Sequence, residues 1–326
     1  MRDLRHYGFE PSCPFWDIRW VYRIPRWIRG WLIIQKFVSS ALAIFLFALS
    51  ILDSDFSICQ QRATCDVAKI QPIMMGRQHQ RLKWCESYLT SDIACDISLE
   101  IELMIIALAT GILDATTFPE YFVFASNQTG NTALLAIGAL SIGRGIVDLR
   151  HVGLSLGAFV AGGLICGQTG NKIGRMSRLW LLITNVLQTV LVFAAAIINT
   201  RRIEAQSSAA DLGIIALLAF ASGAQVASAR TVHVPEVPTA MVTSAYVDFL
   251  VDPSILTLHN RARNRRLCFV ATLLLGSFLG AIAYRYYSPA LALYLSATIK
   301  ALVCIALLFN PQNVQRSMDQ SSQQGV

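Results

Sequence analysis

The sequence predicts an all-α fold, a polytopic bundle of transmembrane helices. Hydrophobic residues make up 54% of the chain and charged residues only 14%, whereas soluble domains carry about 25% charged residues. The mean hydropathy is +0.51. Several apolar runs approach the roughly 20 residues that a helix needs to cross a bilayer. The same composition disfavours the alternative, a soluble protein with a large buried helical core.

Charge and cysteine content exclude several classes of protein. The formal net charge is +7, but the basic residues lie in short loops between apolar runs. That pattern orients a membrane protein and is not typical of nucleic-acid binding. The 8 cysteines form no CxxC motif and lie near no histidine pair at zinc spacing. We therefore expect free thiols, no metal, no cofactor and no nucleic-acid partner.

Residues 1–100 form an N-terminal extension. A basic and aromatic stretch leads into an apolar stretch at 31–52, and a polar segment at 53–100 follows, which we expect in the cytosol. The apolar stretch is an extra span, an interfacial amphipathic segment or a signal-like segment. An extra span would place six N-terminal arginines outside the cytosol. The positive-inside rule therefore favours the interfacial interpretation.

Residues 101–310 form the predicted membrane domain, and residues 311–326 form a Gln/Ser-rich tail that we expect to be disordered. The apolar runs predict six core spans in two repeats, 101–199 and 212–309, each with a short helix after its first span. The expected spans are about 102–124, 152–167, 179–198, 212–229, 267–284 and 291–309, with the first short helix at 132–142.

Two polar stretches interrupt the membrane domain, at 111–131 and 223–244. Each contains a Pro-Glu pair inside otherwise apolar sequence. Backbone groups in a bilayer must be hydrogen-bonded internally, so irregular backbone is tolerated only where it is buried in protein or lines a cavity. These stretches therefore predict broken helices around an interior site.

The two halves carry the same features in the same order, which indicates an internal repeat. A glycine near a polar residue comes first, Gly111 with Asp114 in one half and Gly223 with Gln225 in the other. A Pro-Glu pair, a threonine at the head of a short helix and a span with GxxxG follow in both halves. Because three spans is an odd number, the repeats would be inverted, an arrangement typical of secondary transporters.

Lysine and arginine residues are divided unevenly between the two sides of the predicted bundle. One side collects those at 62–83, 172–178 and 230–266, whereas the other has only a few, near 144–150, 201–202 and 285. Basic loops stay in the cytosol. We therefore predict an integral, multi-pass membrane protein with a cytosolic C-terminus, in a membrane that the sequence does not identify.

Four segments carry a family resemblance: GILDATTF and FVFASNQTGNTALLAIGAL in the first half, and FASGAQVASA and VPEVPTAMVTSAYVDFL in the second. They resemble the domain-of-unknown-function 1275 family, also called YoaK-like membrane proteins, and its fungal members look closest. The likeness covers about residues 95–310. It implies a six-span integral membrane protein and no known activity. Ser244 departs from the family pattern, which has glycine after this threonine.

The polar stretches supply the candidate binding residues. The carboxylate of Asp114 either binds a proton or cation, or is satisfied by nearby hydroxyl and backbone donors. The free N–H groups at the start of a short helix bind either an anion or a capping side chain. Gln128 and Gln225 bond to substrate or to each other. The predicted substrate-binding residues are Asp114, Gln128, Thr129, Gly130, Asn131, Gln225, Thr239 and Thr243.

Two geometric expectations follow from the repeat. Asp114 and Gln225 should face each other where the two polar stretches meet, because a lipid-facing carboxylate would have no compensation. The GxxxG glycines should pack helices closely. These glycines are Gly153, Gly157, Gly163, Gly167, Gly276 and Gly280.

The paired broken stretches predict a transporter or permease for a small polar solute. The alternative is a non-transporting membrane scaffold or chaperone, favoured by the long polar segment at 53–100. No paired acid, base or nucleophile marks an active site, so we predict that the protein is not an enzyme. The expected partners are the lipid bilayer and a small molecule or ion, and the oligomeric state stays open.

Overall fold

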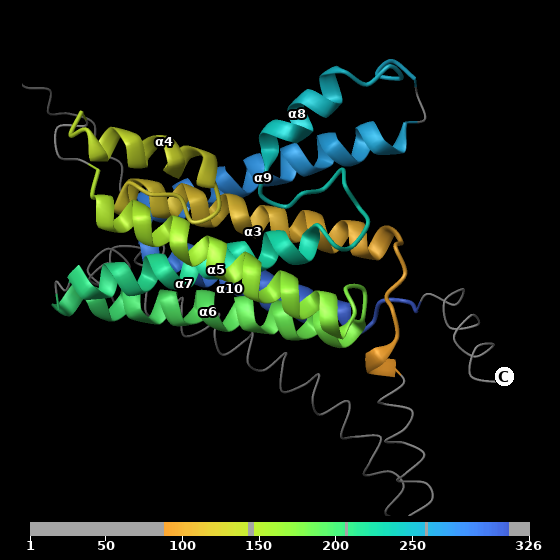
Figure 1. Cartoon of the computed structure of the whole chain (residues 1–326), viewed down its shortest axis with the longest axis horizontal. Helices are drawn as coiled ribbons and strands as arrows, with labels where there is room; N and C mark the ends of the chain where they lie inside the picture. The colour runs from red at the N-terminus through yellow and green to blue at the C-terminus, as the bar shows by residue number, and fades with distance from the viewer. Residues whose placement is uncertain (1–87, 143–146, 206–207, 258–259, 313–326) are drawn as a thin grey trace, which may run out of the picture.

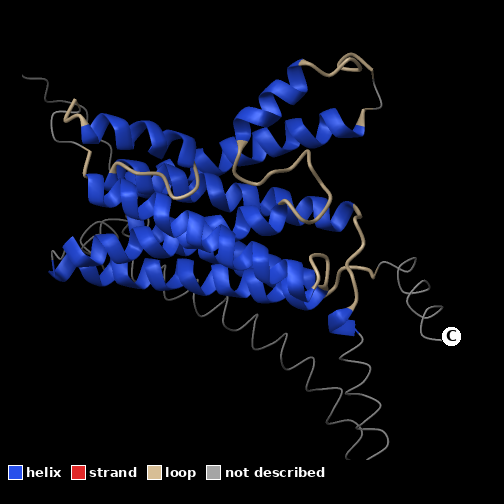
Figure 2. Cartoon of the chain, viewed as in Figure 1, coloured by secondary structure: helices blue, strands red, loops and turns tan. Residues whose placement is uncertain are grey.

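The computed structural model describes residues 88–142, 147–205, 208–257 and 260–312. Within these ranges the chain is helical, with isolated β-bridges and no strand (Figure 2). The helices are α3 (Ile97–Tyr121), α4 (Gln128–Ala139), α5 (Leu149–Ile173), α6 (Arg178–Ala205), α7 (Ser208–Ala229), α8 (Val242–Leu250), α9 (Arg261–Tyr286) and α10 (Pro289–Leu307). The predicted all-α class is confirmed. The predictions for residues 1–87 and for the tail beyond residue 312 lie outside the described residues.

Five of the described helices are long and apolar enough to cross a membrane: α5, α6, α7, α9 and α10. The chain is therefore a multi-pass membrane protein. Their outer faces carry large apolar side chains such as Val160, Leu164, Leu275 and Phe278, which are more than half exposed. Helix α3, the predicted first span, is not among the five. It spans 25 residues but carries several acidic side chains.

Several helices begin where a polar side chain caps the first turn. A side-chain oxygen just before the helix accepts a hydrogen bond from a backbone N–H of the first turn, which would otherwise have no partner. In α10 a proline follows the cap, where its missing N–H costs nothing. The capping residues are Asp96 for α3, Asn127 for α4, Asp148 for α5, Asn260 for α9 and Ser288 for α10.

The break predicted within 111–131 lies later than the proline suggested. Helix α3 continues through Asp114 and Pro119 to Tyr121, and the residue that caps its end, Phe122, has a left-handed φ of 54°. The chain then turns, and α4 begins at Gln128. In the second half, α7 ends at Ala229 and a longer irregular loop leads into α8. Each polar stretch is thus a helix end, a turn and a short second helix.

The first long helix of each half packs against long helices of the other half. Helix α3 of the first half packs against α9 and α10 of the second, and α7 of the second half packs against α5 and α6 of the first. Helices α6 and α10 also contact each other. Figure 1 shows the long helices side by side, with α4 and α8 along one edge and toward opposite ends of the bundle. Helix α4 packs against α5, and α8 packs against α9.

Glycines allow close backbone contact between α3 and α9 and between α5 and α7. A Cβ atom on Gly276 of α9 would lie 2.1 Å from the carbonyl oxygen of Leu108 in α3. A Cβ atom on Gly223 of α7 would lie 2.1 Å from the carbonyl oxygen of Phe159 in α5. No side chain fits at either position, so small residues set the distance between these helices.

Two of the predicted packing glycines make no close helix contact. A Cβ atom on Gly153 or Gly157 would meet nothing within 4 Å in the described part of the chain. The close approach of α5 to α7 occurs at Gly162, where a Cβ atom would lie 2.2 Å from the carbonyl oxygen of Phe220. At about 3.6 residues per turn, Gly153 and Gly157 point away from that face. The other predicted glycines lie against the partner helix: Gly163 and Gly167 near α7, and Gly276 and Gly280 against α3.

Substituting Gly223→Ala should therefore destabilise the protein, whereas Gly157→Ala should not. Alanine raises helix propensity by about 1 kcal/mol at both positions. At Gly223 this gain is outweighed, because overpacking a tight contact typically costs about 1–3 kcal/mol and here the obstacle is backbone. Thermal unfolding of the two purified variants measures the difference. Equal unfolding temperatures for both variants would contradict the close helix contact.

Candidate central binding site

A lysine lies at the centre of the described bundle. Lys300 of α10 is 1% exposed. Its Nζ donates to Oε1 of Gln225 in α7 at 2.5 Å and to Oε1 of Gln188 in α6 at 3.1 Å. Among the described residues no carboxylate lies within 4.0 Å of this ammonium. Two neutral amides thus hold a charge that costs about 2.5–3.5 kcal/mol at a bilayer centre even on the lenient insertion scale.

Gln225 connects the lysine to α3 and to the loop before α8. Its Nε2 donates to Oγ1 of Thr110 in α3 at 2.8 Å and to Oγ1 of Thr239 at 3.1 Å. Thr239 lies in the loop before α8 with a φ of 60°. Left-handed backbone is a genuine outlier for a β-branched residue, and such strain clusters at functional sites. The central network therefore joins four helices and one strained loop residue.

A small cavity lies beside this network. Its volume is about 30 Å³, and Gln188, Gln225 and Thr239 form part of its wall. Further along the wall are Glu102, whose carboxylate accepts a hydrogen bond from the side chain of Asn310 at 2.8 Å, and Asn185. This volume exceeds the roughly 10–15 Å³ that one water molecule needs. The central network therefore borders a small cavity whose wall is partly polar and partly apolar.

The sequence reasoning missed Lys300 and Gln188, because both lie in runs that were interpreted as plain apolar spans. The sequence does contain a feature that indicates Lys300. A single lysine inside an otherwise uncharged span is costly, and such residues face the protein interior and mark functional sites. Gln188 lies in α6 among apolar neighbours and carries the same signal more weakly, since an intramembrane amide also needs a partner.

Asp114 does not face Gln225, so that prediction is wrong. Its carboxylate accepts hydrogen bonds from the backbone N–H of Ser126 at 2.8 Å and from the Ser126 hydroxyl at 2.5 Å. It therefore fixes the turn between α3 and α4 within its own half. The two polar stretches meet instead through Gln225 and Thr110, the residue before Gly111.

The start of α4 is also satisfied by local groups. Asn127 caps it by accepting from the N–H of Gly130 at 3.2 Å. Asn131 is fully buried, and its side chain accepts from the N–H of Phe124 at 2.9 Å and donates to the Phe124 carbonyl at 2.8 Å. This geometry matches the capping alternative for the predicted anion site.

The other predicted residues around the two short helices are not part of the central network. Gln128 donates to the carbonyl of Ala125 at 3.1 Å. Thr129 and Thr243 are exposed, and α8 begins without a side-chain cap. Of the predicted substrate-binding residues, only Gln225 and Thr239 belong to the central network. Asn131 donates to Gln128 at 2.9 Å, but this pair lies at the start of α4.

Ion pairs tie the two halves together at both ends of the bundle. At one end, Glu120 of α3 accepts from Arg202 of α6 at 2.8 Å and from the hydroxyl of Tyr284 in α9 at 3.0 Å. Arg202 also pairs with Asp211 at the start of α7. We call these residues the Glu120 cluster.

At the other end, the carboxylate of Glu236 lies 3.3 Å from Arg265 of α9. Arg265 and Arg261 both pair with Glu100 near the start of α3. We call these residues the Glu236 cluster. Each cluster contains the glutamate of one Pro-Glu pair and an acidic residue near the start of the other half's first helix.

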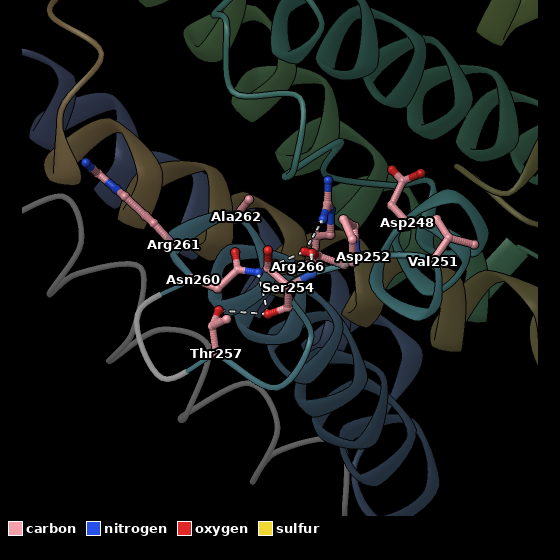
Figure 3. A pocket seen from close by; sticks show the side chains of 10 residues that line it. Asp248, Val251, Asp252, Ser254, Thr257, Asn260, Arg261, Ala262 and Arg266 are labelled. Carbon is pink, nitrogen blue, oxygen red and sulfur yellow. Dashed lines mark hydrogen bonds and ion pairs between the residues drawn. The ribbon is translucent and has the colours of Figure 1, made fainter.

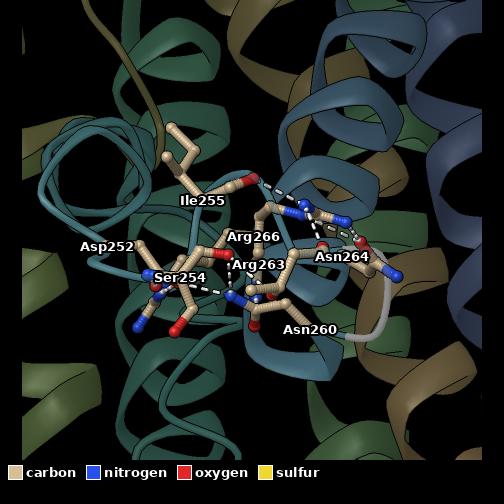
Figure 4. Close-up of polar contacts among 8 residues, drawn as sticks. Asp252, Ser254, Ile255, Asn260, Arg263, Asn264 and Arg266 are labelled. Carbon is tan, nitrogen blue, oxygen red and sulfur yellow. Dashed lines mark hydrogen bonds and ion pairs between the residues drawn. The ribbon is translucent and has the colours of Figure 1, made fainter.

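A wider cavity of about 700 Å³ lies outside the bundle, in the turn between α8 and α9 (Figure 3). Figure 4 shows how polar groups hold this turn. Asp252 accepts from the N–H of Ser254 at 2.8 Å and from the amide of Asn260 at 3.0 Å, and it pairs with Arg266 at 3.3 Å. These donors, the Ser254 N–H above all, lower the pKa of Asp252. The charge of Asp252 is paired with that of Arg266 at the start of α9, and we interpret this turn as structural.

Within the described ranges, no three His, Cys, Asp or Glu side chains gather as a metal site. The described cysteines, Cys95, Cys166, Cys268 and Cys304, are free thiols.

A family model described as "Protein of unknown function (DUF1275)" matches residues 103–306. The chain belongs to this family. The matched range contains the whole central network, from Thr110 to Lys300. No curated protein and no solved structure matches the chain. Within DUF1275, the fungal-type assignment stays a prediction.

In this DUF1275 protein, Gln225→Leu should destabilise the fold strongly, by about 3–5 kcal/mol, because removing one partner leaves the Lys300 charge uncompensated. Lys300→Met in the same chain should recover most of that loss, since the charge is gone. Unfolding free energies of the two single variants and the double variant give the coupling between the two side chains. Strictly additive losses would contradict the hydrogen bond between them.

Proposed function

We propose that this protein is a transporter or permease for a small polar solute, and that the central network is its binding site. The observation that carries the proposal is Lys300, an ammonium held by two amides that line a small cavity. Intramembrane charges are retained where a pathway or substrate needs them. The strained loop residue Thr239 supports the same assignment, since backbone strain clusters at ligand sites.

The proposal includes six core spans, with α3 as the first, in two inverted repeats. The packing between the halves supports this arrangement. The first long helix of each half packs against the second and third long helices of the other half. Glycines make the closest contact in both equivalent pairs. A pseudo-two-fold relation between inverted halves accounts for both features.

The ion-pair clusters suit an alternating-access mechanism. The Glu120 cluster and the Glu236 cluster lie at opposite ends of the helices, and each links the halves. Opening one cluster while the other stays closed would expose the central cavity to one side at a time. The end that holds the Glu236 cluster also carries the arginines of the α8–α9 turn. We therefore place this end and the C-terminus in the cytosol.

The alternative is a non-transporting membrane scaffold or chaperone. Its support is the small volume of the central cavity, about 30 Å³, with which the buried network could serve only to fix helix positions. In neither case do we propose an enzymatic activity.

Cysteine labelling tests the six-span arrangement without knowledge of the substrate. In a chain without native cysteines, Thr90→Cys lies before α3 and Ser141→Cys lies after α4. If α3 spans, a membrane-impermeant maleimide should label the second variant in sealed, right-side-out vesicles and the first only after permeabilisation. Labelling of both variants from the same side would exclude α3 as a span.

Solute flux tests the function itself. Proteoliposomes are challenged with gradients of formate, nitrate, glycerol, urea and ammonium, and volume changes are followed by stopped-flow light scattering. At least one solute should cross faster than in empty liposomes. Lys300→Met should reduce that flux about tenfold or more, which corresponds to a barrier increase of about 1.4 kcal/mol. Lys172→Met, which removes an exposed lysine at the end of α5, should not. The absence of flux for every solute would favour the scaffold.

A further inference from the structure

Gln188 and Gln225 line the central cavity, and the ammonium that they hold, that of Lys300, has no counter-ion close to it. An ammonium group has three N–H donors, and Lys300 uses two of them, on Gln188 and Gln225. The described residues offer no carboxylate within 4.0 Å. Buried charges are normally paired. The Lys300 ammonium therefore lacks both an acceptor for its third N–H and a counter-charge.

Gln188 supplies a second donor group. It is 1% exposed and lines the cavity. Its Oε1 accepts from Lys300, whereas its Nε2 has no acceptor among the described residues. A buried amide N–H without a partner is costly and is usually satisfied by a ligand or an ordered molecule. The amide of Gln188 therefore stands between the ammonium and the cavity with its donors free.

The remaining charged and titratable groups near the cavity are compatible with an anion in this position. Glu102 also lines the cavity, but its carboxylate is not within 4.0 Å of the Lys300 ammonium. One of its oxygens accepts from Asn310. Cys304, one turn after Lys300, contacts the hydroxyl of Thr189 at 3.5 Å. The negative charge of Glu102 disfavours multivalent anions, and the cavity volume of about 30 Å³ excludes large ones.

We propose that the cavity beside Gln188 and Lys300 binds a small monovalent anion of the size of formate or nitrate. The anion accepts hydrogen bonds from Nε2 of Gln188 and provides the counter-charge for the ammonium of Lys300. This inference rests on the proposed function for its biological meaning, because it names the class of solute that the transporter would carry. The binding itself does not depend on transport.

Thermal unfolding of the purified full-length protein tests the binding. Sodium gluconate, whose anion is too large for the cavity, is replaced stepwise by sodium formate or sodium nitrate at constant ionic strength. A ligand of the native state raises the unfolding temperature in a saturable way, by roughly 5–10 °C at one hundred times its Kd. Lys300→Met and Gln188→Leu should abolish the shift, and Lys172→Met should keep it. Lys300→Arg retains the charge and should keep part of the shift, which distinguishes lost binding from a damaged fold.

Two results would overturn the inference: no shift with either anion in the unmodified protein, or an equal shift in Lys300→Met. The outcome is independent of the flux experiment. Anion binding without any flux would leave the site intact and refute transport. Flux of glycerol, urea or ammonium without anion binding would support transport and refute the anion site.

Discussion

The electrostatic requirement of Lys300 determines the organisation of the bundle centre. An ammonium in a low-dielectric interior needs acceptors from several directions, because water cannot supply them. Gln225 comes from α7 and Gln188 from α6. Gln225 in turn needs Thr110 from α3 and Thr239 from the second polar stretch. One charge thereby fixes the relative positions of four helices and requires strained backbone at Thr239.

Ion pairs lie at the two ends of the membrane domain, and neutral polar groups lie in its middle. At the two ends, arginine and carboxylate side chains pair directly, and each cluster joins one half to the other. In the middle, the single charge is held by neutral amides and hydroxyls. Pairs of arginine and carboxylate side chains add geometric specificity, whereas amide contacts are more easily exchanged for a ligand. This separation suits a protein that opens its ends in turn around a central site.

The local features of the fold were predictable from sequence, and the long-range partners were not. Apolar runs located the long helices, because helix formation depends on neighbours in the chain. The first short helix was expected at 132–142 and begins at Gln128, four residues earlier. The hydrogen bond from Gln225 to Thr110 joins residues 115 positions apart, and that from Lys300 to Gln225 joins residues 75 positions apart. No periodicity encodes such pairs. Asp114 was assigned a distant partner, whereas the residue that binds it, Ser126, lies only 12 positions away.

The most direct test of the account is nuclear magnetic resonance of the Lys300 side chain in protein labelled with ¹⁵N at lysine, with Lys300→Met providing the assignment. The account predicts a resolved ammonium signal whose protons exchange slowly with water and show through-space contacts to the side-chain amides of Gln188 and Gln225. Fast exchange with water, or contacts to a carboxylate in place of the two amides, would contradict it.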